Sequence, residues 1–114
     1  MGEASSSMYG SVDLLIMKTL SLGEAKHGLE ISDEIHRFSG REIKIEGNAL
    51  YPSLHRLEAK GLITGEWRVS EKNRRARFYT LTGKGRKRLE KVMGEWLRHT
   101  EAVRAVLDVA EGGA

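Results

Sequence analysis

The strongest constraint on the fold is a long amphipathic pattern in the C-terminal part of the sequence. From residue 82 to residue 110, apolar residues recur at intervals of three and four, which predicts a single helix capped by Thr82. At 1.5 Å per residue, this helix would be about 40 Å long. Leu89, Trp96, Val103 and Ala110 are spaced by seven, close to a heptad seam. A domain of 114 residues cannot cover so long a stripe, so the pattern predicts pairing with a second copy of the chain.

An N-terminal segment adds apolar surface that also needs cover. From Val12 to Leu20 a helix would be apolar around most of its circumference, beginning near Ser11 or Asp13, either of which can cap free amides. In a short chain, another subunit is one source of that cover. The residues predicted to pack between two subunits on these helices are Leu14, Met17, Leu89, Val92, Met93, Trp96, Val103, Val106 and Leu107.

The region between these helices begins with a shorter amphipathic segment. A helix is predicted from Gly28 to about Phe38, where Ser39 and Gly40 stop it. Beyond that stop, the alternating pattern of residues 43–46 predicts a short extended segment.

A third helix carries a row of leucines on one face and polar groups on the other. The leucines at four- and three-residue spacing are Leu50, Leu54 and Leu57. Because proline is tolerated in the first helical turn, Pro52 predicts a start near Asn48 or Ala49, with Asn48 as the cap and Gly61 as the stop. Opposite the leucines lie Asn48, Pro52, His55 and Arg56, with Tyr51 and Ser53 on the flanks.

Two strand-like runs follow, over residues 64–70 and 75–81. The polar residues 71–74 between them predict a hairpin turn, with Asn73 available for a left-handed position. Alternation within the runs predicts packing faces formed by Trp67 with Val69 and by Tyr79 with Leu81.

Positive charge is concentrated in one part of the chain. The formal net charge is +3, yet ten basic residues and only two acidic ones lie between Trp67 and Lys91. A basic segment on an otherwise acidic protein is typical of a surface that binds a phosphate backbone. A solvated surface rich in lysine and arginine is the alternative interpretation.

Composition argues against catalytic and metal chemistry. The chain contains no cysteine, which excludes disulfides, thiol nucleophiles and cysteine-ligated metals. Its four histidines lack metal-ligand spacing, and Leu29-Glu30 stand where a phosphate loop requires lysine and a hydroxyl residue. We therefore expect no enzyme activity, cofactor or metal. With neither an apolar run of membrane-spanning length nor a signal peptide, a cytoplasmic protein is expected.

The order of the elements predicts a mainly α, α+β fold. Three helices followed by a two-stranded β-wing form a winged helix-turn-helix over residues 11–81, and one long dimerisation helix follows over residues 82–110. Residues 1–10 and 111–114 are predicted to be flexible tails.

Three motifs also occur in a characteristic order. His27-Gly28 precedes the second helix. The run 50–58, Leu-Tyr-Pro-Ser-Leu-His-Arg-Leu-Glu, is followed by Gly-Leu-Ile at 61–63. The run 73–79, Asn-Arg-Arg-Ala-Arg-Phe-Tyr, is followed by Leu-Thr at 81–82. In these motifs, over roughly residues 12–110, the sequence resembles the PadR-like family of transcriptional regulators, in its short subgroup with a single C-terminal helix.

The resemblance implies a bacterial homodimeric repressor that binds a pseudo-palindromic operator in double-stranded DNA. The C-terminal helix of each subunit would pack on the N-terminal helix of its partner. In drug-responsive relatives a tryptophan on this helix stacks on planar aromatic ligands. Trp96 resembles that residue by position, so it either packs in the dimer or contacts a small aromatic effector.

Residues of the third helix and of the hairpin would contact the DNA. They are Asn48, Tyr51, Pro52, Ser53, His55, Arg56, Lys72, Asn73, Arg74, Arg75 and Arg77. Tyr51 either donates its hydroxyl to a phosphate or serves as a structural ring, and Arg56 reads guanine or clamps phosphate. Arg77 lies nearer the core, where pairing with an acidic side chain is the alternative.

Two positions depart from the family pattern. Asn48-Ala49 stand where glycine and a hydroxyl residue commonly precede Leu-Tyr-Pro, and Leu29 replaces an aromatic residue. The first departure points to Asn48 as a residue that pairs with adenine. The alternatives to the repressor hypothesis are a winged-helix protein-interaction module without specific DNA binding and an RNA-binding winged helix.

Overall fold

The fold consists of four helices and a small antiparallel sheet. The structure is a computed structural model that describes residues 2–112, with side chains described from Ser11 onward. Its elements are α1 (Gly2–Leu20), β1 (Lys26–His27), α2 (Gly28–Phe38), α3 (Gly47–Ala59), β2 (Ile63–Val69), β3 (Arg75–Leu81) and α4 (Gly83–Leu107). This order confirms the predicted winged helix-turn-helix with one long C-terminal helix.

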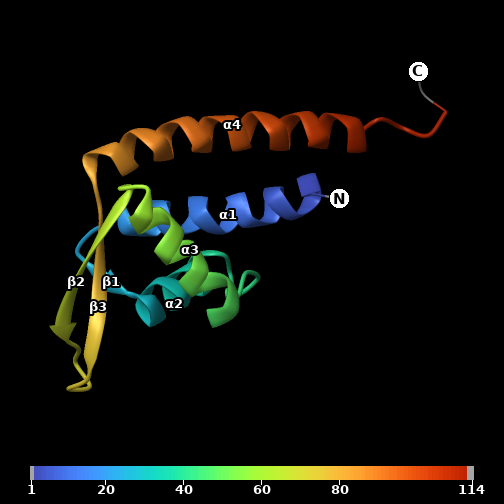
Figure 1. Ribbon diagram of the computed structural model, residues 1–114. Helices are drawn as coiled ribbons and strands as arrows, with labels where there is room; N and C mark the ends of the chain where they lie inside the picture. Colours follow the sequence, from blue (N-terminus) through green and yellow to red (C-terminus); the bar gives the residue numbers. More distant parts are fainter. Residues whose placement is uncertain (1, 113–114) are drawn as a thin grey trace.

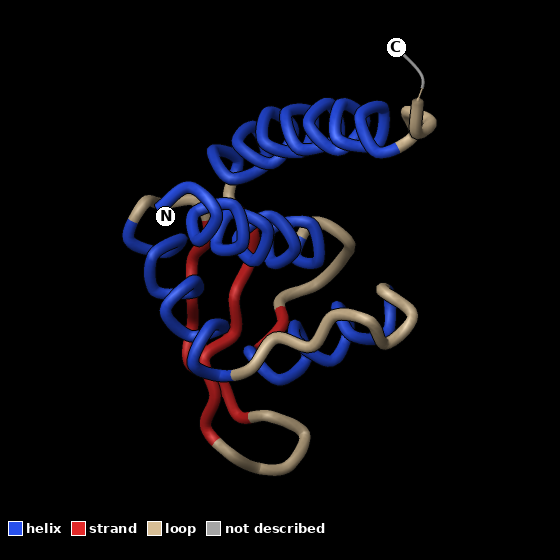
Figure 2. Tube along the Cα trace, turned by 90° about the vertical axis from the view of Figure 1, so that its right-hand side faces the viewer, coloured by secondary structure: helices blue, strands red, loops and turns tan. Residues whose placement is uncertain are grey.

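The long helix and the tip of the hairpin lie at opposite ends of the molecule. Figure 1 shows α4 running alongside α1, with α2 and α3 on the other side of α1 and the β2–β3 hairpin extending away from α4. Figure 2 shows the same separation from the side. We call the β2–β3 hairpin with its turn, residues 63–81, the wing.

Helix α1 forms the centre of the core. Its buried residues Ile16 and Met17 pack within a cluster that includes residues of α2, α3, the wing and the start of α4. Cover for α1 therefore comes from several elements of its own chain. Leu14, Met17 and Leu89 are 7%, 2% and 5% exposed in this single chain. Their predicted role between subunits is therefore wrong, because the intrachain core already buries them.

The first helix also begins earlier than the sequence pattern predicted. It begins at Gly2, whereas a start near Ser11 or Asp13 and a flexible tail over residues 1–10 were expected. The only proline of the chain is at position 52, so no strong helix breaker precedes Ser11. Residues 113–114 of the predicted C-terminal tail lie outside the described residues.

The third helix begins slightly earlier than predicted, at Gly47. Glu46 is its N-cap, without a side-chain cap bond, and the N–H groups of Ala49 and Leu50 donate to the Glu46 carbonyl at 2.9 and 2.8 Å. Asn48 is therefore not the cap, and Pro52 lies in the second turn. A proline there has no N–H to donate to the Asn48 carbonyl, so the helix gives up one internal hydrogen bond.

The predicted ends of two helices are confirmed. Helix α3 ends before Gly61, whose φ of +74° allows the Leu62 N–H to reach the Leu57 carbonyl at 3.0 Å. Helix α2 ends at Phe38, before Gly40 with φ of +66°.

The sheet has three strands in the order β1-β3-β2, all antiparallel. The wing strands and the left-handed Asn73, with φ of +59°, match the prediction. Strand β1 was not foreseen, because two residues carry no periodic signal. Residues 42–46 form no strand, and within the short extended segment predicted over residues 43–46 the backbone of Glu46 is extended, with φ of −78° and ψ of 161°.

Helix α4 packs on the core only through its first three turns or so. Thr82 caps it as predicted, accepting the Gly85 N–H at 2.9 Å. Val92 and Met93 are half-buried against the core, whereas every residue from Glu95 to Gly112 is exposed. The helix ends at Leu107, before the predicted Ala110.

Gly85 marks a close approach of α4 to the start of β2. A Cβ added at Gly85 would lie 2.0 Å from the Leu62 carbonyl oxygen, which is backbone and cannot turn aside. We expect Gly85→Ala to lower the free energy of unfolding by about 1–3 kcal/mol, measured by urea denaturation.

Gly83→Ala is the matched control, because a Cβ at Gly83 would meet no described atom within 4 Å. We expect this variant to be neutral or more stable by up to about 1 kcal/mol, as alanine favours helix. Equal effects of the two substitutions would contradict the close approach.

Candidate nucleic-acid interface

A groove separates the start of α2 from α3 and the wing. Its volume is about 800 Å³. The groove is lined by residues of all three elements: His27, Gly28, Leu29, Glu30, Asp33, Tyr51, His55, Trp67, Ser70, Glu71, Lys72, Arg74, Arg75, Ala76, Arg77 and Tyr79. It thus brings α3 residues and wing residues, predicted separately from the sequence, to one surface.

The outer face of α3 presents four of the predicted contact residues to solvent. Asn48, Tyr51, Pro52 and His55 are all exposed. The Tyr51 ring packs over glycine, since a Cβ added at Gly28 would lie 3.0 Å from its Cε1 atom. Tyr51 nevertheless remains 44% exposed. Its ring is therefore packed while much of the residue stays accessible, so the two interpretations of Tyr51 are compatible.

Two predicted contact residues of α3 are used inside the protein instead. Ser53 is 1% exposed, on the buried side of the helix. The Arg56 guanidinium donates from Nη2 to Asp13 Oδ1 of α1 at 2.8 Å and to Ser53 Oγ at 2.9 Å. Helical projection placed Arg56 on the outer face, but it could not show that a carboxylate of α1 lies within reach.

One face of the wing changes from apolar to cationic along its length. Near α4 this face carries the buried Ile63, Tyr79 and Leu81, and toward the turn it carries Trp67 and Arg75. Trp67 and Val69 are exposed, so the prediction that this pair forms a packing face is wrong. The reason is that this end of the β2–β3 hairpin extends beyond the hydrophobic core. The Arg75 guanidinium instead stacks on the Trp67 ring at 4.7 Å from its centroid.

Arg77 connects the wing to α3. Its guanidinium donates through Nε and Nη2 to the Glu58 carboxylate of α3, which confirms the predicted acidic partner. Arg77 also lies 5.5 Å from the centroid of the Trp67 ring. The hydrogen bond from Arg77 lowers the pKa of Glu58 below 4.5, and the carboxylate raises the pKa of Arg77.

The cations nearest the wing turn are not neutralised in this way. Lys72, Arg74 and Arg75 are exposed, and no carboxylate among the described side chains lies within 4.0 Å of their charged groups. Asn73 forms the turn, where the Ser70 N–H donates to the Arg74 carbonyl at 2.7 Å. The turn therefore concentrates positive charge without acidic partners.

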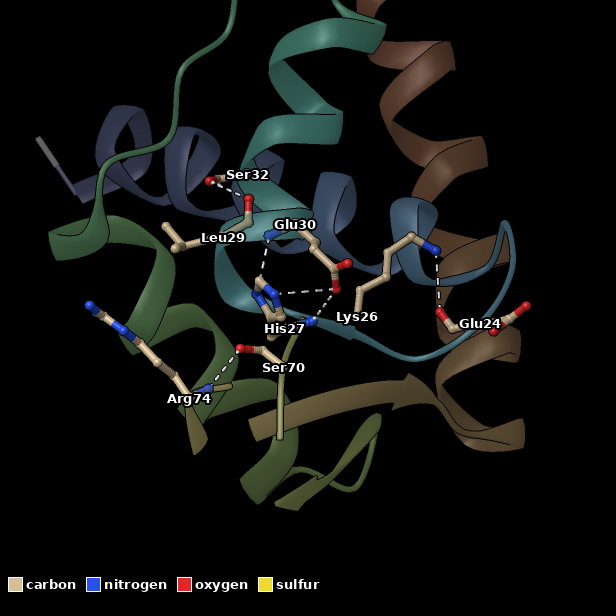
Figure 3. Close-up of polar contacts among 8 residues, drawn as sticks. All are labelled: Glu24, Lys26, His27, Leu29, Glu30, Ser32, Ser70 and Arg74. Atoms are coloured by element: carbon tan, nitrogen blue, oxygen red, sulfur yellow. Dashed lines mark hydrogen bonds and ion pairs between the residues drawn. The ribbon is translucent and has the colours of Figure 1, made fainter. Parts of the chain in front are cut away.

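Sequence reasoning missed the role of His27 at the start of α2. Its Nδ1 atom accepts the Glu30 N–H at 3.4 Å, and the Glu30 carboxylate accepts the His27 N–H at 3.0 Å. The His27 ring also meets the Phe78 ring of β3 edge-on, with the ring centroids 5.1 Å apart. Figure 3 shows this cap together with Ser70 and Arg74 of the wing.

The site offers cations, amides and hydroxyls rather than a catalytic arrangement. Within residues 2–112 no cluster of three or more histidine, aspartate or glutamate residues could hold a metal ion. Nor does any helix of that part have the length and apolar character needed to cross a membrane. The arrangement is suited to binding a polyanion that spans α3 and the wing turn.

The lowered pKa of Glu58 makes the wing contact dependent on pH. Because the folded-state value lies below the unfolded one, the pair stabilises the protein at neutral pH and this contribution is lost as pH falls below about 4.5. We expect Glu58→Gln to be less stable than the unaltered protein at about pH 7, and the difference to shrink toward about pH 3. Urea denaturation across this range measures the difference.

Glu66→Gln is the control, since its exposed carboxylate bridges the exposed Arg68 at 3.2 Å. Exposed pairs contribute little, so this variant should stay close to the unaltered protein at every pH. A Glu58→Gln difference that is constant with pH would contradict the assignment.

Comparison with known proteins agrees with this fold. The model of the "Transcriptional regulator PadR-like family" matches residues 16–91. Over 60 residues the chain is 42% identical to a transcriptional regulator of Mycobacterium tuberculosis, covering 53% of this chain and 52% of that protein. The structure of a transcriptional regulator from Clostridium thermocellum superposes with a TM-score of 0.77 at 28% identity, covering 89% of this chain and 94% of that one.

A PadR-like transcription factor from Bacteroides fragilis gives a TM-score of 0.74 at 25% identity, covering 93% of this chain and 99% of that one. These relatives are transcriptional regulators and not enzymes. The family match, the order of the elements and the motifs at α3 and the wing lead to one conclusion: the chain belongs to the PadR-like family of transcriptional regulators.

Proposed function

We propose that this transcriptional regulator acts as a homodimeric repressor that binds double-stranded DNA through α3 and the wing. The observation that carries the proposal is the group of cations Lys72, Arg74 and Arg75, which no described carboxylate neutralises, on the same groove as the exposed Tyr51 and His55 of α3. A duplex presents a row of phosphates beside base edges, which matches cations beside a helix with short polar groups.

The two parts of the surface have different tasks. The wing cations supply salt-sensitive affinity for phosphate that does not depend on sequence. Asn48 and His55 on α3 read base edges in the major groove, and an asparagine can bind adenine through two hydrogen bonds. Tyr51 donates its hydroxyl to a phosphate. Ser53, Arg56 and Arg77 are left out of this interface, because each is buried or held by a partner within the chain.

A second copy of the chain is proposed to cover the exposed part of α4. The large apolar residues exposed there are Trp96, Leu97, Val103, Val106 and Leu107, and Val109 is exposed just beyond the end of the helix. Leu97 and Val109 add to the residues predicted from the sequence, and Val92 and Met93 extend the same helix toward the core. Burial of such a face by a two-fold mate supplies the missing hydrophobic contact.

Dimerisation would place two copies of α3 on successive major grooves, about 34 Å apart, of a pseudo-palindromic operator. Bound protein would repress by excluding polymerase where that operator overlaps a promoter. Trp96, 37% exposed and tilted against His99, packs in the dimer and offers a ring face on which a small planar aromatic effector can stack.

The wing assignment is tested with DNA. We expect the triple variant Lys72→Ala, Arg74→Ala, Arg75→Ala to bind both specific and scrambled duplexes more weakly. The slope of log affinity against log salt should become shallower by about 0.9 for each phosphate that the variant no longer neutralises. Fluorescence anisotropy across a salt series measures both, with duplex from upstream of the reading frame and duplex enriched from a random library.

The control removes the same charge from α4, at the opposite end of the molecule, through Arg86→Ala, Lys87→Ala, Arg88→Ala. We expect the control to retain most of the affinity and its salt slope. Identical weakening in both triple variants would show that only net charge matters. Preference of the unaltered protein for structured RNA, or no binding to any duplex at low salt, would overturn the DNA proposal.

The dimer is tested by placing charge on the exposed face of α4. Val106→Asp with Leu107→Asp should convert the dimer into a monomer by sedimentation, since burying carboxylates in an apolar interface is unfavourable. Because these side chains are 72% and 76% exposed in the single chain, the core fold should persist by circular dichroism. Glu111→Gln with Asp108→Asn is the control. An unaltered protein that sediments as a monomer at all concentrations would contradict the proposal.

A further inference from the structure

An ion pair between α1 and α3 holds the arginine that the sequence assigned to DNA. Arg56 donates to both carboxylate oxygens of Asp13, from Nη2 to Oδ1 at 2.8 Å and from Nε to Oδ2 at 3.4 Å. The two residues are 43 positions apart in the sequence, and both are only partly exposed. Because two nitrogens of the guanidinium contact two oxygens of the carboxylate, this bidentate ion pair fixes the relative orientation of the two groups as well as the distance between them.

The same guanidinium is fixed on its other side by α3 itself. Arg56 Nη2 also donates to the hydroxyl of the buried Ser53, one turn earlier, at 2.9 Å. Ser53 thereby holds the arginine against its own helix while Asp13 holds it against α1. This network explains why a serine is buried among leucines: its hydroxyl has a charged partner.

Asp13 lies on the helix that connects the core to the proposed dimer interface. Helix α1 contacts α3 on one side and α4 on another, as Figures 1 and 2 show. The row Leu50, Leu54 and Leu57 buries α3 in the core, but apolar contact is non-directional and permits small rotations. The Asp13–Arg56 pair is the directional contact between α1 and α3.

We propose that Asp13 is a positioning residue for sequence reading: through Arg56 it fixes the rotation of α3 on α1, so that Asn48 and His55 face the bases in one orientation. This inference rests on the proposed DNA-binding function. It assigns Arg56 to orientation of the recognition helix rather than to contact with a base or a phosphate.

The opposite arrangement is that Asp13 withholds Arg56 from DNA. The two arrangements predict opposite effects of Asp13→Asn, which keeps the shape of the side chain and removes its charge. If Asp13 positions α3, affinity for the specific duplex falls. If Asp13 restrains a DNA-binding arginine, affinity rises and the salt slope steepens by about 0.9, as one more phosphate is neutralised.

The experiment uses the full chain with two duplexes of equal length, one enriched from a random library by the unaltered protein and one scrambled. We expect Asp13→Asn to lower affinity for the enriched duplex about tenfold, the size of one base-pair mismatch. Affinity for the scrambled duplex should stay equal or rise, because the substitution adds positive charge. The salt slope on the scrambled duplex should not change.

Two further variants separate positioning from general stability. Arg56→Met should weaken discrimination to the same degree, and the double variant Asp13→Asn, Arg56→Met should discriminate no worse than either single one, since both break the same ion pair. Asp13→Glu, which restores the carboxylate, should recover part of the discrimination. Glu101→Gln on the exposed part of α4 removes an equal charge and should leave the discrimination between the two duplexes unchanged.

Several results would overturn the proposal. The first is tighter binding of the Asp13→Asn variant to the enriched duplex. The second is a loss of affinity in Arg56→Met that exceeds the loss in Asp13→Asn on both duplexes. The third is an equal loss of affinity of Asp13→Asn for both duplexes, accompanied by a lower melting temperature of that variant. If the unaltered protein enriches no duplex at all, the DNA-binding function itself fails, and that result is distinct from these.

Discussion

The buried leucine row of α3 is the contact on which the rest of the structure depends. Leu50, Leu54 and Leu57 are almost fully buried and pack in one core with Ile16 of α1. Burying this row decides which side of α3 faces solvent, and therefore which short polar groups are available to a ligand. Two ion pairs then orient the helix: Arg56 binds α1, and Glu58 binds the wing.

The wing shows how pairing distributes charge along a hairpin. Arg77, near the core, is neutralised by Glu58 and lies beside Trp67, whereas the cations of the turn have no described acidic partner. The Arg77–Glu58 ion pair thus has a structural role at the base of the wing, whereas the wing turn keeps its positive potential. Because the Arg77–Glu58 ion pair connects β3 to α3, the position of the charged turn depends on the position of α3.

Local signals made much of this fold predictable. The wing strands, left-handed Asn73, the Thr82 cap and the stop at Gly61 each follow from a few neighbouring residues, and all were confirmed. The fold class followed from their order, and the acidic partner of Arg77 from its nearness to the core.

Contacts between distant parts of the chain were not predictable in this way. Periodicity identifies an apolar stripe but not what covers it, so Leu14 and Leu89 were assigned to a partner although the core of one chain buries them. A helical projection says nothing of Asp13, which reaches Arg56 from another helix.

The exposed part of α4 makes helix formation depend on its surroundings. From Glu95 to Leu107 the helix spans about 20 Å, and every residue along it is exposed in the single chain. The packed first turns of α4 already nucleate this part, but propagation of an uncovered helix in water is only marginally favourable, so its free end frays. In the proposed dimer a second copy covers these turns, so the ordered length of α4 would depend on protein concentration: the distal turns fray into coil where the monomer prevails and become helical again where the dimer forms.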